Sequence, residues 1–170
     1  MTSYLLKHFP KKQQKYNYDC AVCSFYTVLH YLGSKIKYND IITLAKTSPE
    51  EGTFNVDIKR MLDKLKVDYI AEKTTVTKLR YYTSNDIPVI IDIQYRKEYK
   101  KDLSKTWKYG HYVVVLAVTN TKIIFMDPGY GEIRSLLITS LKERWHDKDA
   151  GQIYRNYAII CLSKENKYYK

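Results

Sequence analysis

A cysteine, a histidine and an aspartate occur in an order that suits nucleophilic catalysis on a carbonyl carbon. Cys20 opens a segment with helical periodicity, where unpaired backbone N–H groups and the helix dipole stabilise a thiolate. His111 follows Gly110 at the start of the strongest predicted strand, and Asp127 ends the next strand along the chain. A thiolate, an imidazole and a carboxylate that orients the imidazole form a nucleophile–base–orienter set.

The spacing along the chain predicts that the histidine and the aspartate meet. In a hairpin that turns near Asn120, residues 111 and 127 lie within about two positions of direct opposition, so the carboxylate of Asp127 reaches His111. Gln14 lies shortly before the cysteine and supplies a side-chain amide, as an oxyanion donor would.

Periodicity assigns these residues to helices followed by strands. Apolar residues recur at three- and four-residue spacing after Asp19, which suits an N-cap, and Gly33 suits the end of that helix. Asn55 is predicted to cap a later helix. Further helices are predicted over residues 39–45, 56–66, 76–82 and 139–145, and strands over residues 67–71, 89–93, 111–118, 123–127, 133–137 and 157–162. Helices first and then a meander of strands predict an α+β fold.

Several motifs together resemble the C39 peptidase family, the papain-like domains that cleave double-glycine leader peptides in bacteriocin exporters. Gln14, five residues and then Cys20 match its N-terminal motif, and the run from Gly110 to Val115 matches its histidine motif. Asp127-Pro128 matches its aspartate motif, and residues 141–145 resemble its closing helix. The resemblance covers residues 10–150.

The resemblance implies a papain-like cysteine peptidase fold, in which N-terminal helices, with the nucleophile at a helix start, pack on an antiparallel sheet. It implies that Cys20 is the nucleophile and that His111 is the general base and then the general acid. It further implies that Asp127 orients the imidazole, and that Gln14 and the Cys20 backbone N–H form the oxyanion hole. Small residues, in Gly-Gly or Gly-Ala sequences, would precede the cleaved bond of a peptide or protein substrate. No metal or organic cofactor is implied.

Two features depart from the family pattern. Ala21 stands where the family usually has glycine after its cysteine, and a methyl group there narrows the approach to the oxyanion hole. The transmembrane and ATPase parts of an exporter are absent, so we expect a free-standing C39-like protein, and a leader-peptide substrate does not follow automatically.

The other cysteines offer alternatives. Cys23 would be the nucleophile if the chain followed the papain-type Cys-Gly-Ser-Cys-Trp signature, but Ser24 replaces the aromatic residue. Cys20 and Cys23 have CxxC spacing, yet no second CxxC completes a zinc site. Cys161 lies in an apolar stretch and is predicted to be a core residue.

Length and composition limit the class of protein. The chain has 170 residues, of which 45% are hydrophobic and 28% charged, and this predicts one globular domain over residues 1–170. The longest apolar run, residues 112–118, is too short to span a bilayer, and the N-terminus lacks a signal peptide. Three cysteines do not form a disulfide framework. We therefore expect a cytoplasmic protein.

The net charge of +11 leaves nucleic acid open as a partner. The basic residues are scattered and mostly lysine, whereas specific phosphate and guanine contacts favour arginine. The first hypothesis is therefore a cysteine peptidase. A catalytically inactive C39-like peptide-binding domain and a basic nucleic-acid-binding protein are the alternatives. Trp107, Tyr109 and Tyr112 are candidates to line a substrate cleft.

Overall fold

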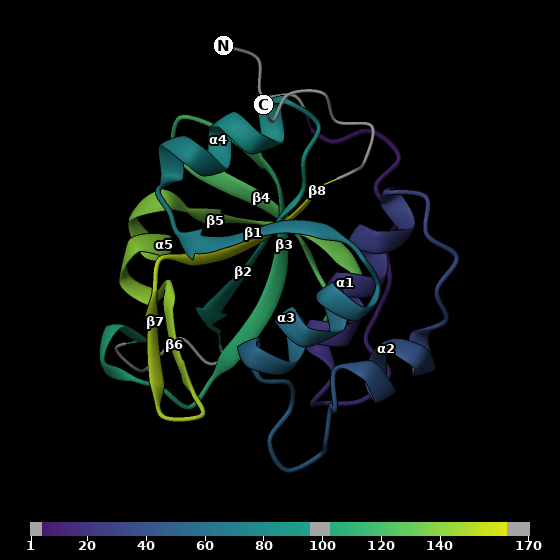
Figure 1. The fold of residues 1–170 in the computed structure, drawn as a ribbon. Helices are drawn as coiled ribbons and strands as arrows, with labels where there is room; N and C mark the ends of the chain where they lie inside the picture. The colour runs from purple at the N-terminus through teal and green to yellow at the C-terminus, as the bar shows by residue number, and fades with distance from the viewer. Residues whose placement is uncertain (1–4, 96–102, 163–170) are drawn as a thin grey trace.

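The computed structural model describes residues 5–95 and 103–162, and its elements follow the predicted order with helices first (Figure 1). The helices are α1 (Cys20–Tyr31), α2 (Tyr38–Leu44), α3 (Asn55–Lys64), α4 (Val76–Ser84), α5 (Ile138–Arg144) and a short 3-10 helix η1 (Leu103–Lys105). The strands are β1 (Asp68–Lys73), β2 (Val89–Gln94), β3 (Gly110–Val118), β4 (Lys122–Asp127), β5 (Glu132–Leu137), β6 (His146–Asp149), β7 (Gln152–Arg155) and β8 (Tyr157–Leu162).

Six strands form one antiparallel sheet in the order β1-β8-β2-β3-β4-β5. The predicted meander is correct for β2 to β5, but it is wrong at the other edge, because β8 lies between β1 and β2. A second sheet, the β6–β7 hairpin, was not predicted. Its first strand reads His-Asp-Lys-Asp and carries no apolar alternation, so the usual signal for a strand is missing.

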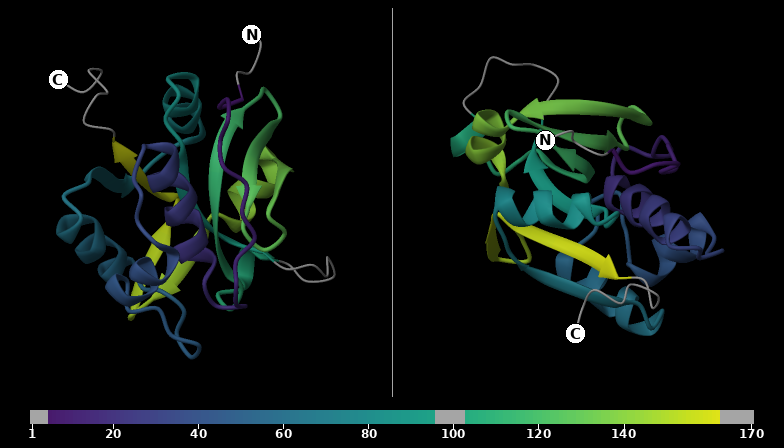
Figure 2. Two further views of the ribbon diagram at one scale, coloured as in Figure 1. Left: turned by 90° about the vertical axis from the view of Figure 1, so that its right-hand side faces the viewer. Right: turned by 90° about the horizontal axis from the view of Figure 1, so that it is seen from above.

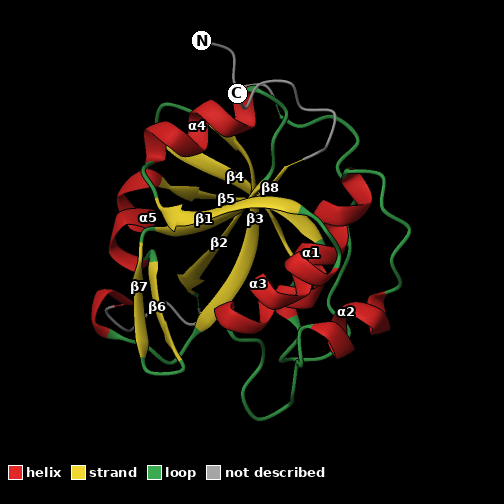
Figure 3. Cartoon of the chain, in the orientation of Figure 1, coloured by secondary structure: helices red, strands yellow, loops and turns green. Residues whose placement is uncertain are grey.

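Helices cover both faces of the large sheet (Figure 3). One core cluster joins α1, α2 and α3 to side chains such as Val114 and Leu116 of β3. A second cluster joins α4 and α5 to alternate side chains of the same strand, among them Val113 and Val115. A strand with both faces buried needs apolar residues at every position, which explains the continuous apolar run of β3. Cys161 is fully buried in the first cluster, as predicted.

Of the two predicted helix caps, Asp19 is confirmed in position and Asn55 is wrong. Asn55 is the first residue of α3 and not its cap. Its backbone N–H and its side-chain amide both donate to Oδ2 of Asp149, at 2.7 and 2.8 Å. The side chain therefore anchors the start of α3 to the β6–β7 hairpin. Asp19 occupies the N-cap position of α1, but its side chain accepts no capping hydrogen bond from the helix.

The described part of the N-terminal segment runs beside α1 and the ends of β3 and β4 (Figure 2). The backbone N–H of Leu6 donates to the Leu116 carbonyl at 3.3 Å, and that of Gln14 donates to the Pro128 carbonyl at 2.8 Å. Phe9 is buried against the ring of Tyr31, at 5.2 Å between centroids. The segment is thus fixed to the sheet at several points before the chain reaches Cys20.

Within the described residues, every helix is too short or too polar to cross a bilayer.

The packing of α1 on β3 predicts the effect of one core truncation. Leu116→Ala removes a fully buried side chain and should lower the free energy of unfolding by about 2 to 5 kcal/mol. Leu137→Ala is the matched control, because that leucine is 47% exposed and its truncation should change stability by less than about 0.5 kcal/mol. Urea unfolding of both variants measures the difference, and equal losses would contradict the packing described here.

Candidate active site

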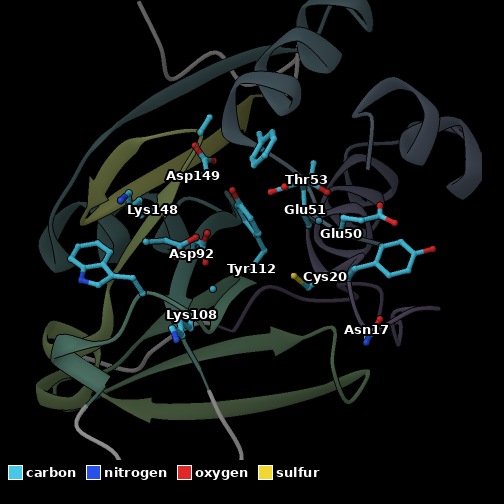
Figure 4. A pocket seen from close by; sticks show the side chains of 18 of the residues that line it. Asn17, Cys20, Glu50, Glu51, Thr53, Asp92, Lys108, Tyr112, Lys148 and Asp149 are labelled. Carbon is cyan, nitrogen blue, oxygen red and sulfur yellow. The ribbon is translucent and has the colours of Figure 1, made fainter. Parts of the chain in front are cut away.

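Cys20 is the first residue of α1, and its side chain lines a cavity (Figure 4). The backbone N–H groups of the first helical turn have no partners within the helix, and they stabilise negative charge at its start. The hydroxyl of Ser24, one turn further along α1, donates to the Tyr112 carbonyl at 3.3 Å. This hydrogen bond fixes α1 to β3 at the residue after His111.

The buried carboxylate of Asp19 organises the loop before the nucleophile. It accepts hydrogen bonds from the backbone N–H of Tyr16 at 3.0 Å and of Lys15 at 3.3 Å. The hydroxyl of Tyr38 in α2 donates to the same carboxylate at 2.9 Å. Asp19 is therefore the N-cap residue of α1 and also holds the loop of residues 15–19 against α2.

His111 and Asp127 lie in contact at the ends of two paired strands. Nε2 of His111 is 2.8 Å from Oδ1 of Asp127, which also accepts the backbone N–H of Gly129 at 2.9 Å. Asp127 is fully buried, and Nε of Arg134 lies 3.7 Å from its second oxygen. Because Nε2 faces the carboxylate, Nδ1 is the ring nitrogen left to exchange a proton with a neighbouring thiol.

The electrostatics of this pair favour a charged imidazole. Burial on its own lowers the pKa of His111, but the hydrogen bond that its ring donates to Asp127 and the interaction with the Cys20 sulfur raise it to about 9. An imidazolium at neutral pH is the partner that a thiolate requires. The stacked ring of Tyr95, at 5.3 Å between centroids, covers one face of the imidazole.

Gln14 lies beside His111 and Asp127 because the N-terminal segment packs closely against the turn after β4. Gly131 has φ +68, and a Cβ there would lie 2.8 Å from the backbone nitrogen of Gln13. The side-chain amide of Gln14 donates to the Tyr16 carbonyl, and its own oxygen is buried without a partner among the described residues. One N–H of the amide is therefore engaged, and the other is available to a ligand.

The predicted residues border two cavities that meet at Asn17. Cys20 lines a cavity of about 440 Å³ together with Tyr112 and Trp107, two of the aromatic residues proposed for a cleft. Gln14, His111 and Asp127 line a second cavity of about 540 Å³. Asn17 lines both. The third proposed aromatic residue, Tyr109, is not part of either lining.

The remaining cysteines lie away from this arrangement. Burial raises the pKa of the Cys23 thiol to about 12, and Cys23 is also hydrogen bonded to the Lys12 carbonyl at 3.2 Å. Burial raises the pKa of Cys161 to about 12. Ala21 is 1% exposed and is among the residues that line the cavity beside Cys20.

A pair of acidic residues next to His111 was missed by the sequence analysis. Asp92 of β2 accepts the backbone N–H of His111 at 2.8 Å, and its carboxyl shares a hydrogen bond with Asp147 of β6. Burial and the neighbouring charge of Asp147 raise the pKa of Asp92 well above its ordinary value. Gly110 permits this arrangement, since a Cβ there would lie 2.6 Å from Oδ2 of Asp147. The only sequence signal was an acidic residue inside an apolar strand.

No three His, Cys, Asp or Glu side chains in residues 5–95 and 103–162 are grouped closely enough to hold a metal ion. Independently of this, Cys20, His111 and Asp127 offer a nucleophile, an acid–base group and an orienting carboxylate, a set suited to acyl transfer.

A family model, described as the peptidase C39 family, matches residues 8–148 of this chain. No curated protein sequence matches the chain.

Solved structures of peptidase domains share the fold. The peptidase domain of Streptococcus ComA, a bi-functional ABC transporter involved in a quorum sensing pathway, is 21% identical, with a TM-score of 0.68 over 92% of this chain and 100% of that one. A structure described as a C39-like peptidase from Bacillus anthracis is 13% identical, with a TM-score of 0.74. The match covers 95% of this chain and 98% of that one. A double glycine motif protease from an AMS/PCAT transporter, in complex with the leader peptide, is 13% identical, with a TM-score of 0.64. The match covers 95% of this chain and 98% of that one. The antiparallel sheet with its helices is thus the fold of C39 peptidase domains.

The charged imidazole predicts which thiol reacts. Iodoacetamide should alkylate Cys20 at neutral pH, because the pKa of His111 is raised to about 9 and a cationic imidazole stabilises negative charge beside it. Cys23 and Cys161 should react only under strongly alkaline conditions, since burial raises the pKa of each to about 12. Mass spectrometry of each cysteine after labelling across a pH series measures the three profiles.

The control for this labelling is His111→Ala, which should move the Cys20 profile to higher pH and leave the other two cysteines unchanged. A Cys20 profile that is insensitive to His111→Ala would show that the two side chains are not coupled.

The buried acid pair predicts a pH-dependent stability. Because the pKa of Asp92 is raised in the folded protein, its contribution to stability is full at low pH and is lost as pH rises through the folded pKa. Asp92→Asn retains a donor and an acceptor but does not titrate, so it should be more stable than wild type at about pH 8, with a smaller difference at about pH 5. Urea unfolding at both values measures this, with exposed Asp40→Asn as control. An equal loss of stability at both pH values would refute it.

Proposed function

The chain belongs to the peptidase C39 family, and from that premise we propose that it is a cysteine peptidase that cleaves peptide bonds after small residues. One observation carries the proposal. The start of α1 presents Cys20 beside an imidazole whose pKa is raised to about 9 and whose other nitrogen is 2.8 Å from the buried carboxylate of Asp127. A thiolate–imidazolium pair of this kind is the reactive form of a cysteine peptidase.

In the proposed reaction, Cys20 and His111 share the work of acylation. The thiolate of Cys20 attacks the carbonyl carbon, and a tetrahedral oxyanion forms. The imidazolium of His111 then gives its Nδ1 proton to the leaving amine, the C–N bond breaks, and a thioester remains on Cys20. Asp127 keeps the ring oriented and compensates its positive charge throughout.

Deacylation uses the same groups in the reverse roles. The neutral imidazole of His111 removes a proton from water, which attacks the thioester carbonyl. The second tetrahedral intermediate collapses, releases the acid and restores the thiolate of Cys20. The proposed oxyanion donors are the Cys20 backbone N–H and the N–H of Gln14 that is not engaged by the Tyr16 carbonyl.

The preference for Gly-Gly or Gly-Ala sequences is the finer part of the proposal. It is supported by the family and by the double glycine motif protease whose fold the chain shares. We also propose that residues 1–170 form a single C39-like domain. The family model ends at residue 148, but β8, beyond that limit, pairs with both β1 and β2 inside the large sheet.

A catalytically inactive peptide-binding domain is the second candidate. It is favoured by two observations at the oxyanion hole. The Gln14 amide donates to the Tyr16 carbonyl, and Ala21 replaces the glycine that usually follows the cysteine. If this candidate is correct, peptides bind beside Cys20 without being cleaved.

Substitution of the nucleophile separates the two candidates. Wild type should cleave peptides that contain Gly-Gly, and Cys20→Ala should lower the rate by at least about a thousandfold, because no thioester can form. Peptide binding, measured by fluorescence anisotropy with the same labelled peptide, should persist in Cys20→Ala. Mass spectrometry of the products locates the cleaved bond.

Cys23→Ala is the matched control, since it removes the other thiol of the CxxC pair and should retain cleavage. Binding without cleavage by wild type would favour the inactive domain. Equal cleavage of Val-Val peptides would reject the preference for small residues.

A further inference from the structure

The cavity beside Cys20 is acidic, although the protein as a whole carries a net charge of +11 (Figure 4). One loop and two strands, β2 and β6, contribute its carboxyl groups, which come from Glu50, Glu51, Asp92, Asp147 and Asp149. We refer to this cavity, with these five residues, as the acidic pocket. Two lysines, Lys108 and Lys148, also line it and are exposed. The local excess of carboxyl groups opposes the overall charge and is not a consequence of composition.

A buried hydroxyl group in the wall of the acidic pocket has no hydrogen-bond partner in the described part of the chain. Tyr112 is 7% exposed and lines the pocket, and its hydroxyl makes no hydrogen bond to any of the described residues. Figure 4 shows its ring between Cys20 and Asp149, with the hydroxyl on the side of Asp149. Because an unpaired buried hydroxyl is costly, this group is suited to a ligand that donates a hydrogen bond.

Within residues 5–95 and 103–162, no basic side chain forms an ion pair with Asp92, Asp147 or Asp149. Burial and the charge of Asp147 raise the pKa of Asp92, so these two carboxyl groups do not readily ionise together. Asp149 receives hydrogen bonds from Asn55, but these come from neutral donors. A positively charged group in the pocket would favour ionisation of both Asp92 and Asp147, whose pKa values are raised.

The geometry favours an organic cation over a metal ion. Within the described residues, no three carboxylates lie close enough together to coordinate one ion. The pocket has a volume of about 440 Å³, which admits a long side chain. An ammonium or guanidinium group carries several N–H donors, which match dispersed carboxylates and the Tyr112 hydroxyl.

We propose that the acidic pocket binds a lysine or arginine side chain of the peptide whose bond Cys20 attacks. This inference rests on the proposed peptidase function and adds a charge requirement to it. Because the residues before the cleaved bond are small, the cationic side chain belongs to another position of the same peptide. Charged groups away from the cleaved bond select the peptide and fix its position relative to Cys20, but they take no part in the chemistry.

The first test compares peptides that differ only in charge. Lysine is placed at each position flanking a Gly-Gly bond, with norleucine as the neutral equivalent, and kcat/KM is measured for each pair. At one position wild type should prefer lysine by about tenfold, as expected for hydrogen bonds to a charged group. In Glu51→Gln and in Tyr112→Phe, the ratio of kcat/KM for the lysine peptide to that for the norleucine peptide should fall toward 1.

Matched controls separate binding from folding. Tyr112→Phe removes a hydroxyl with no partner, so its melting temperature should not fall. Glu143→Gln removes an exposed carboxylate on α5, outside the pocket lining, and should retain the full preference for lysine. Equal cleavage of lysine and norleucine peptides at every position would overturn the proposal.

The second test does not require peptidase activity. The rates at which a cationic aminoethyl and a neutral methyl methanethiosulfonate modify Cys20 are compared by mass spectrometry. The cationic reagent should react faster, and Glu51→Gln should reduce the ratio of the two rates, whereas Glu143→Gln should not.

Together, the two tests distinguish failure of the proposed cation site from failure of the proposed peptidase function. Peptide cleavage without any charge preference in either test overturns the acidic pocket as a cation site and leaves the peptidase intact. A charge preference at Cys20 without cleavage of any peptide overturns the proposed function and supports the pocket as a cation site.

Discussion

The buried carboxylate of Asp127 is the constraint on which the arrangement of the site depends. A charge that is fully buried must be compensated, and here the compensation comes from the His111 ring, the Gly129 N–H and the more distant Arg134. The β3–β4 ladder brings the two strand ends together despite an irregularity between Val115 and Ala117. The contact orients the imidazole, so one nitrogen faces the carboxylate and the other remains for a thiol.

The second requirement is that an element from the other half of the chain reaches this imidazole. Helix α1 packs on one face of β3, and the hydroxyl of Ser24 reaches the Tyr112 carbonyl. Burial of β3 on both faces makes this position rigid, because neither face can shift without opening a core cluster. The N-terminal segment is held against the turn after β4 in the same way.

Two acidic residues that hold parts of the fold in place also line the cavity beside Cys20. Asp92 accepts the backbone N–H of His111 and also lines the cavity beside Cys20. Asp149 anchors the start of α3 through Asn55 and lines the same cavity. Groups that hold the strand and the helix in place therefore also set the charge of the surface beside the nucleophile.

The sequence by itself determined the order of the elements other than η1, β6 and β7, the α+β class, and the contact between His111 and Asp127. These depend on local periodicity and on spacing within a hairpin, which is short-range information. The tertiary structure decided the place of β8 between β1 and β2, the β6–β7 hairpin and the pairing of Asp92 with Asp147. It also made Asn55 a link to Asp149 in place of a helix cap, and it joined the cap residue Asp19 to Tyr38 of α2. Those features depend on which buried polar groups meet across the fold, and only the assembled core brings such groups together.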